Sequence, residues 1–244
     1  MTIAITSGKG GTGKTTAVAA IGSCFAALGK KTVCIDMDLA LRNLDLALGM
    51  RDLPILDMSD VAAGRCKLEE AAAPHPEIPN LYLLMGPPPE SGAPFTQEDL
   101  GGIVGQIRED FDVCIIDAPA GIGEGFRFSA AFADKAIVIC TGDSTSLRDA
   151  QKTVMELGEM GIEDIALIVN RVRAGIIRKT FADIDDMMDY IGAPIIGVVP
   201  EDRDVLIASG QGKALVLSSH GKAAKSFLRI MRRLSGERVP LKYK

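Results

Sequence analysis

The sequence of 244 residues lacks the residues that several common kinds of site require. His75 and His220 are the only histidines, too isolated for a metal site or a general base, and we expect both at the surface. The five cysteines include no Cys-x-x-Cys pair, which is typical of reduced thiols packed in a protein core. The longest apolar runs have the length of a strand, so no segment is expected to span a bilayer.

The sequence also lacks a linker, an internal repeat, a low-complexity tract and a secretory signal. Short apolar runs alternate with helical stretches, which predicts an α/β fold in three layers, a mostly parallel sheet flanked by helices on both faces. We expect one domain over residues 1–236 and a short basic C-terminal tail over residues 237–244. Residues 86–92 are rich in proline and glycine and are expected to form a surface loop.

The most informative segment is residues 8–16, which read Gly-Lys-Gly-Gly-Thr-Gly-Lys-Thr-Thr. They fit the phosphate-loop template G-x-x-x-x-G-K-[ST] and lie between a predicted strand, Thr2–Thr6, and a predicted helix, Thr15–Leu28. Glycines let consecutive backbone N–H groups surround an anion, and the helix adds the positive end of its dipole. The residues expected to contact a nucleotide are Gly8, Gly10, Gly11, Thr12, Gly13, Lys14, Thr15 and Thr16.

Two residues of this loop have predicted chemical roles. Lys14 would reach the β- and γ-phosphates of a triphosphate, and the Thr15 hydroxyl would ligate the Mg²⁺ that bridges the same oxygens. The alternative is a glycine-rich turn with a solvated lysine, and it does not account for the strand and helix on either side. ATP and Mg²⁺ are therefore the predicted ligands.

A second lysine, Lys9, is not required by the general template. With it, the loop resembles that of the deviant Walker A (ParA/MinD) family of P-loop ATPases, in which this lysine is the signature residue. The resemblance implies an ATP-dependent homodimer in which Lys9 of each chain reaches the phosphates held by the other. Such a cation would neutralise charge on the transferred phosphoryl group, an effect of about 10³- to 10⁵-fold for arginine fingers. The alternative is a solvated loop lysine.

The segment after the predicted strand Thr32–Asp36 is similar to the first switch of the MinD branch of this family. Asp36 and Asp38 form an Asp-x-Asp motif, and the sequence Leu-Arg-Asn-Leu-Asp comes shortly after it, within residues 37–49. The resemblance implies that Asp38 orients or deprotonates the attacking water and contributes to the metal site, roles that suit a carboxylate. It also implies that Arg42 and Asn43 lie at the dimer face. The structural alternative is that the two aspartates end a strand and cap a helix.

A Walker B acid is expected where the predicted strand Asp112–Asp117 ends, and Asp117 would help to hold the water shell of Mg²⁺. The loop that follows contains Gly121, Gly123 and Gly125, which predict a second switch that responds to a γ-phosphate. Their spacing is also a weak dinucleotide-binding signal. We discard that interpretation because no phosphate turn with a ribose-binding acid accompanies it.

Two later predicted strands complete the resemblance. Ile165–Asn170 ends in Val-Asn and is followed by an arginine, and Ile195–Val199 is followed by Pro-Glu-Asp-Arg. In the family the asparagine hydrogen-bonds the adenine edge, which suits an amide because it offers both a donor and an acceptor. The Pro-Glu-Asp loop closes over the base, although either segment alone would be an ordinary loop. The residues implied at the base are Asn170, Arg171, Pro200 and Asp202.

Positive charge is concentrated at the C-terminal end. Residues 222–244 carry a net charge of +7 against −12 for the rest, which sums to the −5 of the chain. Apolar residues recur between these charges and predict an amphipathic helix over residues 222–234, for which we favour packing on the core over docking on an anionic membrane. The resemblance implies a separate membrane helix after it, which is not evident because Gly236 and Pro240 interrupt that segment. The predicted apolar positions are Ala224, Phe227, Leu228, Met231 and Leu234.

The resemblance implies an ATP-hydrolysing dimerisation switch in the placement of the division septum, with a MinC-like inhibitor and a MinE-like activator. It implies a cytoplasmic protein that can associate with the inner face of the cell membrane. The main alternative is a ParA-like ATPase that positions DNA or another cargo, with DNA the weaker expectation. A non-hydrolysing scaffold is disfavoured by the intact lysines and aspartates, and iron–sulfur relatives by the lack of a cysteine just after Asp117.

Overall fold

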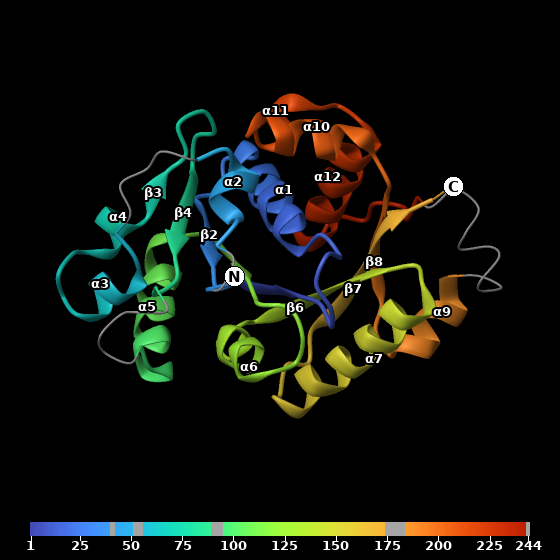
Figure 1. Cartoon of the computed structure of the whole chain (residues 1–244), viewed down its shortest axis with the longest axis horizontal. Helices are drawn as coiled ribbons and strands as arrows, with labels where there is room; N and C mark the ends of the chain where they lie inside the picture. The colour runs from blue at the N-terminus through green and yellow to red at the C-terminus, as the bar shows by residue number, and fades with distance from the viewer. Residues whose placement is uncertain (40–41, 51–55, 89–94, 174–183, 243–244) are drawn as a thin grey trace.

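One β-sheet forms the centre of the computed structural model, which describes residues 1–39, 42–50, 56–88, 95–173 and 184–242 (Figure 1). Its strands are β1 Thr2–Thr6, β2 Thr32–Asp36, β3 Ala73–Pro74, β4 Leu81–Met85, β5 Val113–Asp117, β6 Lys135–Thr141, β7 Ile165–Val172 and β8 Ile195–Pro200. The order across the sheet is β3-β4-β2-β5-β1-β6-β7-β8, and among these described strands only β3 and β4 pair in antiparallel fashion. The predicted α/β fold with a mostly parallel sheet is confirmed.

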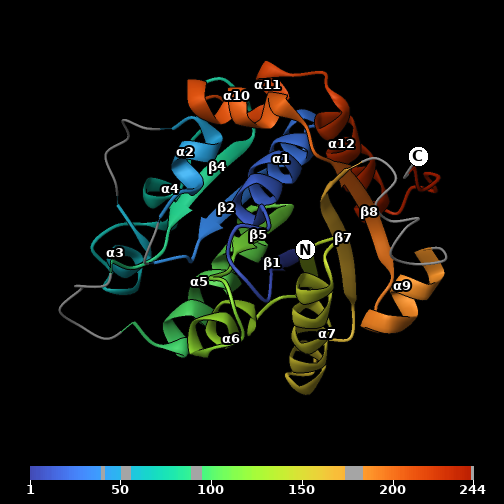
Figure 2. The same ribbon diagram turned by 45° about the vertical axis from the view of Figure 1, so that its right-hand side comes forward.

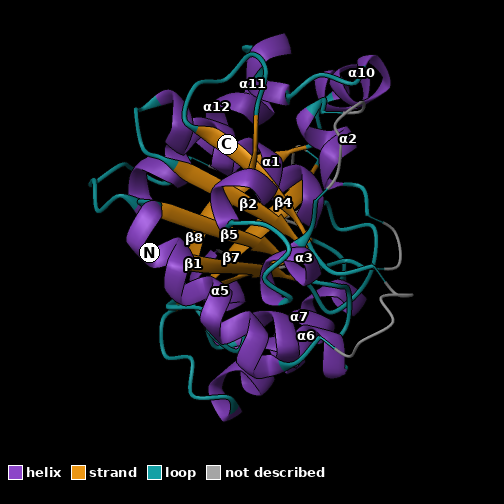
Figure 3. Ribbon diagram, turned by 90° about the vertical axis from the view of Figure 1, so that its left-hand side faces the viewer, coloured by secondary structure: helices purple, strands orange, loops and turns teal. Residues whose placement is uncertain are grey.

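Helices cover both faces of the sheet and give the predicted three layers (Figure 3). One face carries α1 Lys14–Ala27, α2 Leu44–Leu48, α10 Arg203–Gln211, α11 Leu215–Ser218 and α12 Lys222–Leu234. The other face carries α3 Met58–Ala62, α4 Leu68–Ala71, α5 Gln97–Asp110, α6 Glu124–Ala130, α7 Ser144–Glu159 and α9 Ile184–Ile191.

The central strands are buried on both sides because alternate side chains point into the two helical layers. In β1, Ile3 and Ile5 belong to the core under α1 and α12, whereas Ala4 packs with α6 and α7. Every residue of β1 and β2 is buried. Strands of this kind are nearly continuous apolar runs, which explains why the sequence predicted the bounds of both.

The strands β2, β5 and β1 end at one edge of the sheet, with α1 crossing one face of them (Figure 2). Asp36 at the end of β2 is in register with Asp117 at the end of β5, and Asp117 is in register with Ile5 of β1. Parallel strands bring the loops after their carboxyl ends together. The three loops that carry the predicted site therefore meet at this edge.

The C-terminal helix α12 has the predicted bounds and packs on the core against α1 and β8. Phe227 and Ile230 on its inner side are almost fully buried. The predicted apolar position Leu228 is wrong, because this side chain is 43% exposed and lies on the outer side with Lys225 and Arg232. Within the described residues, no helix combines the length and apolar character needed to cross a membrane.

The segment after α12 also contacts the domain. The Arg233 guanidinium donates hydrogen bonds to the carbonyls of Ile196 at 2.7 Å, Val239 at 2.9 Å and Pro240 at 2.6 Å. Leu241 packs against the core beside β8 and α9. The domain boundary after residue 236 stays a prediction, and residues 243–244 of the predicted tail and 89–92 of the predicted surface loop lie outside the described residues.

The expectation of a surface position is wrong for His75, which is buried, whereas His220 is exposed. Nδ1 of His75 accepts hydrogen bonds from the backbone N–H groups of Glu77 and Ile78, both at 3.0 Å, and Nε2 donates to the Leu48 carbonyl at 2.8 Å. The imidazole thus satisfies three backbone groups, a tertiary role that sequence spacing does not reveal. All five cysteines are free thiols, and four of them are buried as predicted.

Candidate functional site

The loop between β1 and α1 has the conformation of an anion cradle. Gly11 and Gly13 adopt positive φ angles of 77° and 94°, which residues with side chains disfavour. Gly13 is the N-cap of α1, no side chain caps this helix, and its first turn contains no acidic residue. The backbone N–H groups at the helix start are therefore left for a ligand, and the helix dipole favours an anion there.

Two glycines of the loop are required by close packing. A Cβ atom at Gly8 would lie 2.6 Å from the Cβ atom of Asp149 and 2.7 Å from its carbonyl oxygen in α7. A Cβ atom at Gly13 would overlap with the side-chain nitrogen of Asn170. A Cβ atom at Gly10 would meet nothing within 4 Å, so this side of the loop is open to a ligand.

Lys14 is buried at the start of α1, near a buried carboxylate at the end of β5. Asp117 is 1% exposed, and neither carboxylate oxygen has a hydrogen-bond partner of normal geometry among the described residues. Burial raises the pKa of Asp117 to about 7, although the Thr15 hydroxyl and the Lys14 ammonium group act against this rise. A buried carboxylate without partners is unfavourable, and a bound cation would satisfy it.

This part of the site fits Mg²⁺. The described part of the chain contains no group of three or more His, Cys, Asp and Glu residues that could form a metal cage. Mg²⁺ does not need one, because it is held by one or two carboxylates together with waters and substrate phosphates. The predicted ligands Thr15, Asp38 and Asp117 would be such a partial set, and the unpartnered oxygens of Asp117 favour it. Their binding of a metal stays a prediction.

The loop after β2 is held by Asp36. Its Oδ1 accepts a hydrogen bond from the N–H of Asp38 and its Oδ2 from that of Leu44, both at 3.0 Å. Burial raises the pKa of Asp36 to about 6, although the two hydrogen bonds act to lower it. The structural alternative is therefore correct for Asp36, which ends a strand and caps α2. Asp38 is half-buried and close enough to Asp117 to raise the pKa of that carboxyl.

The two residues predicted at a dimer face lie in the same loop. Arg42 has a positive φ of 45°, and its guanidinium donates to the carbonyl of Gly86 at 3.3 Å. Asn43 is exposed, so it is accessible to a second chain. Residues 40–41 of this predicted switch lie outside the described residues, and the dimer contact itself stays a prediction.

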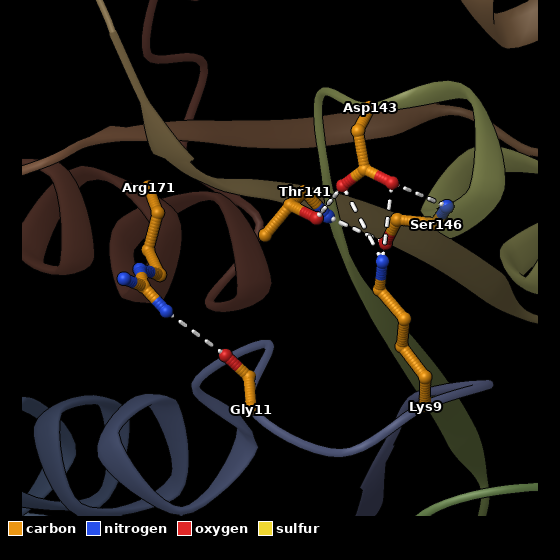
Figure 4. A network of polar contacts seen from close by, with 6 residues as sticks. All are labelled: Lys9, Gly11, Thr141, Asp143, Ser146 and Arg171. Carbon is orange, nitrogen blue, oxygen red and sulfur yellow. Dashed lines mark hydrogen bonds and ion pairs between the residues drawn. The ribbon is translucent and has the colours of Figure 1, made fainter.

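Lys9 contacts its own chain. Its Nζ lies 3.1 and 3.4 Å from the two carboxylate oxygens of Asp143 (Figure 4). Asp143 is the N-cap of α7 and accepts hydrogen bonds from the Thr141 hydroxyl at 2.5 Å and the Ser146 N–H at 3.0 Å. Burial acts to raise the pKa of Asp143, but these hydrogen bonds and Lys9 together lower it to about 2. Sequence reasoning missed Asp143, since 134 residues separate it from Lys9.

Asn170 and Arg171, near the end of β7, contact the phosphate loop. Figure 4 shows Arg171 on the side opposite Lys9. The Asn170 side chain donates to the carbonyl of Thr12 at 2.8 Å, and the Arg171 guanidinium donates to the carbonyl of Gly11 at 3.2 Å. Arg171 also forms an ion pair with Glu201 at 3.7 Å. The structure thus brings both residues to the loop, and their contact with a base stays a prediction.

The Pro-Glu-Asp segment connects β8 to the C-terminal helices. Pro200 ends β8. The carboxylate of Asp202 caps the starts of both α10 and α12, because it accepts hydrogen bonds from the N–H groups of Asp204 at 3.1 Å and Ala223 at 3.0 Å. The hydrogen bond from Ala223 lowers the pKa of Asp202. The carboxylate thus has a structural function, and its predicted role at the base stays a prediction.

The predicted second switch lies between β5 and α6. Gly121 has a φ of 91° and donates its N–H to the carbonyl of Ser7 at 2.9 Å, so this loop contacts the start of the phosphate loop. Ile122, the next residue, is 41% exposed. The loop thus contacts the start of the phosphate loop and also reaches the surface, and its response to a bound γ-phosphate stays a prediction.

A cradle of this geometry at a helix start, facing an unpartnered carboxylate across the sheet edge, defines a P-loop nucleotide-binding protein. Comparison with known proteins identifies the class more closely. Residues 3–216 match the family described as the CobQ/CobB/MinD/ParA nucleotide binding domain. The chain is 38% identical over 240 residues to the septum site-determining protein MinD of Synechocystis, covering 98% of this chain and 90% of the relative.

Solved structures agree with this assignment. MinD in the MinC:MinD complex of Aquifex aeolicus superposes with a TM-score of 0.91 at 35% identity, over 99% of this chain and 98% of that one. MinD of Pyrococcus horikoshii, complexed with Mg-ADP, gives a TM-score of 0.83 at 29% identity over 96% of each chain. The chain therefore belongs to the MinD/ParA family of nucleotide-binding ATPases, in its MinD-type, septum site-determining branch.

Proposed function

We propose that this chain hydrolyses ATP, and that ATP closes a dimer of two copies whose formation controls placement of the division septum. The observation that carries this proposal is the buried Lys14 beside the unpartnered carboxylate of Asp117 at the phosphate loop. The Mg-ADP bound by the related MinD of Pyrococcus horikoshii supports Mg²⁺ and an adenine nucleotide as the ligands here.

The residues of the cradle have separate roles in this proposal. The glycine-rich loop binds the phosphates through its N–H groups, and Lys14 neutralises charge on the β- and γ-phosphates. Thr15, Asp38 and Asp117 would hold Mg²⁺, which neutralises charge between these phosphates when bound. Asp38 orients a water molecule for attack and accepts its proton. Asn170, Arg171, Pro200 and Asp202 would surround the base.

Lys9 acts across the dimer in this proposal. The ion pair that it forms with Asp143 joins two side chains that are 36% and 52% exposed. Such a pair is worth only about 0–1 kcal/mol, so Lys9 is readily transferred to the phosphates of a second chain. Loss of the γ-phosphate would weaken that contact and allow Lys9 to return to Asp143. Nucleotide state and dimer state are then coupled through one side chain.

The partners follow from the relatives. The MinC:MinD complex of Aquifex aeolicus supports a MinC-like partner, and the family resemblance supports a MinE-like activator. We also propose that the protein is cytoplasmic and contacts the anionic inner surface of the cell membrane, because Lys222, Lys225 and Arg232 are exposed on α12. The same three cations support the second candidate, a ParA-like ATPase that contacts DNA phosphates.

Light scattering with ATP, ADP and no nucleotide tests the proposal, together with phosphate release by the parent and a Lys14→Ala variant. We expect a dimer only with ATP and release at least about 100-fold slower in the variant, because Lys14 stabilises the transferred phosphoryl group. Equal release by both proteins would refute it. Sedimentation with anionic vesicles that depends on ATP supports the membrane contact, whereas salt-sensitive, ATP-dependent retention on DNA favours the ParA-like candidate.

A further inference from the structure

The buried carboxylate of Asp36 connects the two ends of the loop that contains Asp38. Asp36 is 1% exposed, and its two oxygens accept the N–H groups of Asp38 and Leu44, each at 3.0 Å. Asn43, the N-cap of α2, makes no side-chain capping hydrogen bond. Asp36 therefore supplies the cap of α2 from eight residues upstream and fixes the backbone of Asp38 with the same group.

We propose that Asp36 is a positioning residue that orients the Asp38 carboxylate for hydrolysis, an inference that rests on the proposed ATPase function. Hydrogen bonds to a charged acceptor are stronger than neutral ones, so the Asp38 backbone is held firmly. The carbonyl of Asp38 also accepts the N–H of Arg42 at 2.9 Å. With both its N–H and its carbonyl bonded, Asp38 has a fixed backbone, which sets the direction of its Cα–Cβ bond.

A purely structural cap would not require a carboxylate at this place. Asp36 is in register with Asp117, so the fold places two buried carboxylates on neighbouring strand ends. Buried like charges are unfavourable, and a neutral amide would avoid that. An amide has only one acceptor oxygen, however, and would leave either Asp38 or Leu44 without a partner. The second acceptor is what the charge provides.

The test is Asp36→Asn, which keeps the shape and removes one acceptor. We expect kcat to fall about 10- to 100-fold, since small misplacement of a catalytic group has effects of this size. The Kd for ATP should change by less than about threefold, and ATP should still produce a dimer, because the cradle itself is unchanged. A general loss of structure would instead weaken nucleotide binding and lower the melting temperature together with kcat.

Asp57→Asn is the matched control. Asp57 is also a buried cap, of α3, and it accepts hydrogen bonds from the Ser59 N–H at 2.8 Å and the Ser59 hydroxyl at 2.6 Å. The variant should lose stability but keep kcat within about twofold, because the hydrogen bonds described for Asp57 are to Ser59 and Asp60 and not to Asp38. If Asp36→Asn does not fold, Asp36→Glu replaces it, since this variant keeps both acceptors and displaces them by one methylene. A kcat equal to that of the parent would overturn the inference in either variant.

A double variant tests whether Asp36 acts through Asp38. Asp36→Asn should have no further effect on kcat in an Asp38→Ala background, because the group that it orients is gone. A further tenfold fall in the double variant would overturn the inference.

Hydrogen exchange distinguishes failure of the proposed function from failure of the inference about Asp36. If the parent releases no phosphate, the ATPase proposal fails. Exchange of the Asp38 and Leu44 amides in nucleotide-free protein then shows whether Asp36 holds the backbone of Asp38. These amides should exchange at least about tenfold faster in Asp36→Asn than in the parent, and their exchange rates should be unchanged in Asp57→Asn. Unchanged exchange in Asp36→Asn would overturn the inference without reference to hydrolysis.

Discussion

The inner wall of the nucleotide site and its outer rim differ in burial and in how their charges are balanced. The inner wall comprises Lys14, Asp36 and Asp117, each less than a tenth exposed. The outer rim comprises the ion pairs of Lys9 with Asp143 and of Arg171 with Glu201, whose side chains are between 36% and 56% exposed. The carboxylates of the wall have raised pKa values, while that of Asp143 is lowered.

This difference separates two tasks within one site. In the wall, the low dielectric strengthens electrostatic interactions, and a bound cation would satisfy the carboxylate oxygens of Asp117, which lack hydrogen-bond partners of normal geometry among the described residues. In the rim, solvent screens each pair, so partners can be exchanged at small cost. We infer that Lys14 and Asp117 of the wall set nucleotide and metal affinity, and that the rim sets the response of the dimer. Changes in the two regions should therefore have different signatures.

The largest expected effect is that of Lys9→Ala in the rim. Hydrolysis should fall by about 10³-fold or more, because the phosphoryl group loses the cation supplied by the second chain. Nucleotide binding by the monomer should stay within about threefold of the parent, since Lys14 and the loop remain. Dimerisation with ATP should be lost, because the lysine that would contact the phosphates of the second chain is gone. Phosphate release, nucleotide titration and light scattering with ATP measure hydrolysis, binding and dimerisation.

Lys67→Ala provides the control for Lys9→Ala, because Lys67 is an exposed lysine at the start of α4 whose Nζ lies 3.7 Å from Glu69. It should leave all three quantities unchanged. A dimer that still forms with ATP in Lys9→Ala would place the coupling outside the rim and remove the distinction between the two regions.

The next effect concerns Asp117 and the stability of protein without Mg²⁺ or nucleotide. Because its folded pKa is about 7 against an ordinary value of 3.8, the folded state keeps a proton that the unfolded state has released. The free energy of unfolding should therefore fall as pH rises from about 4 to 7 and then level off. Asp117→Asn removes this dependence and should be more stable than the parent at pH 8, by about 2–4 kcal/mol. Urea unfolding at pH 5 and pH 8 measures the difference.

The contribution of Asp99 to the free energy of unfolding has the opposite dependence on pH, and Asp99→Asn should remove that contribution. Hydrogen bonds from the backbone and side chain of Thr96 lower the pKa of Asp99. Its contribution is therefore present at neutral pH and is lost only as pH falls below the ordinary range of an aspartate. An Asp117→Asn variant with the same pH dependence as the parent would show that the wall is not electrostatically strained.

The sequence predicted the wall well and the rim poorly. Lys14 and Thr15 lie in one local pattern of strand, loop and helix, and Asp117 ends a predicted strand, so each residue could be assigned from its neighbours in the sequence. The pairing of Lys9 with Asp143 joins positions 134 residues apart, and it depends on how β1 and β6 lie next to each other in the sheet. No local pattern contains that information.

The same limit applies to the fold. The bounds of β1, β2 and α12 followed from apolar periodicity, but periodicity does not fix the rotation of a helix against its core. Leu228 is therefore exposed although it falls in the predicted stripe, while Ile230 is buried. The burial of His75 and the capping role of Asp202 were not predicted for a related reason. Their partners are backbone groups supplied by distant turns and helix starts.

The smallest expected effect is that of Asp143→Asn, which keeps an acceptor for the Ser146 N–H and removes the charge that holds Lys9. Stability should change by less than about 1 kcal/mol, as expected for an exposed pair. Dimerisation with ATP should become up to about fivefold tighter, because Lys9 no longer has to leave a partner within its own chain. Light scattering over a range of protein concentrations measures this shift, and the substitution should have no effect in a Lys9→Ala background. Weaker dimerisation would instead mean that Asp143 serves the closed dimer, and the rim would then stabilise the ATP state rather than compete with it.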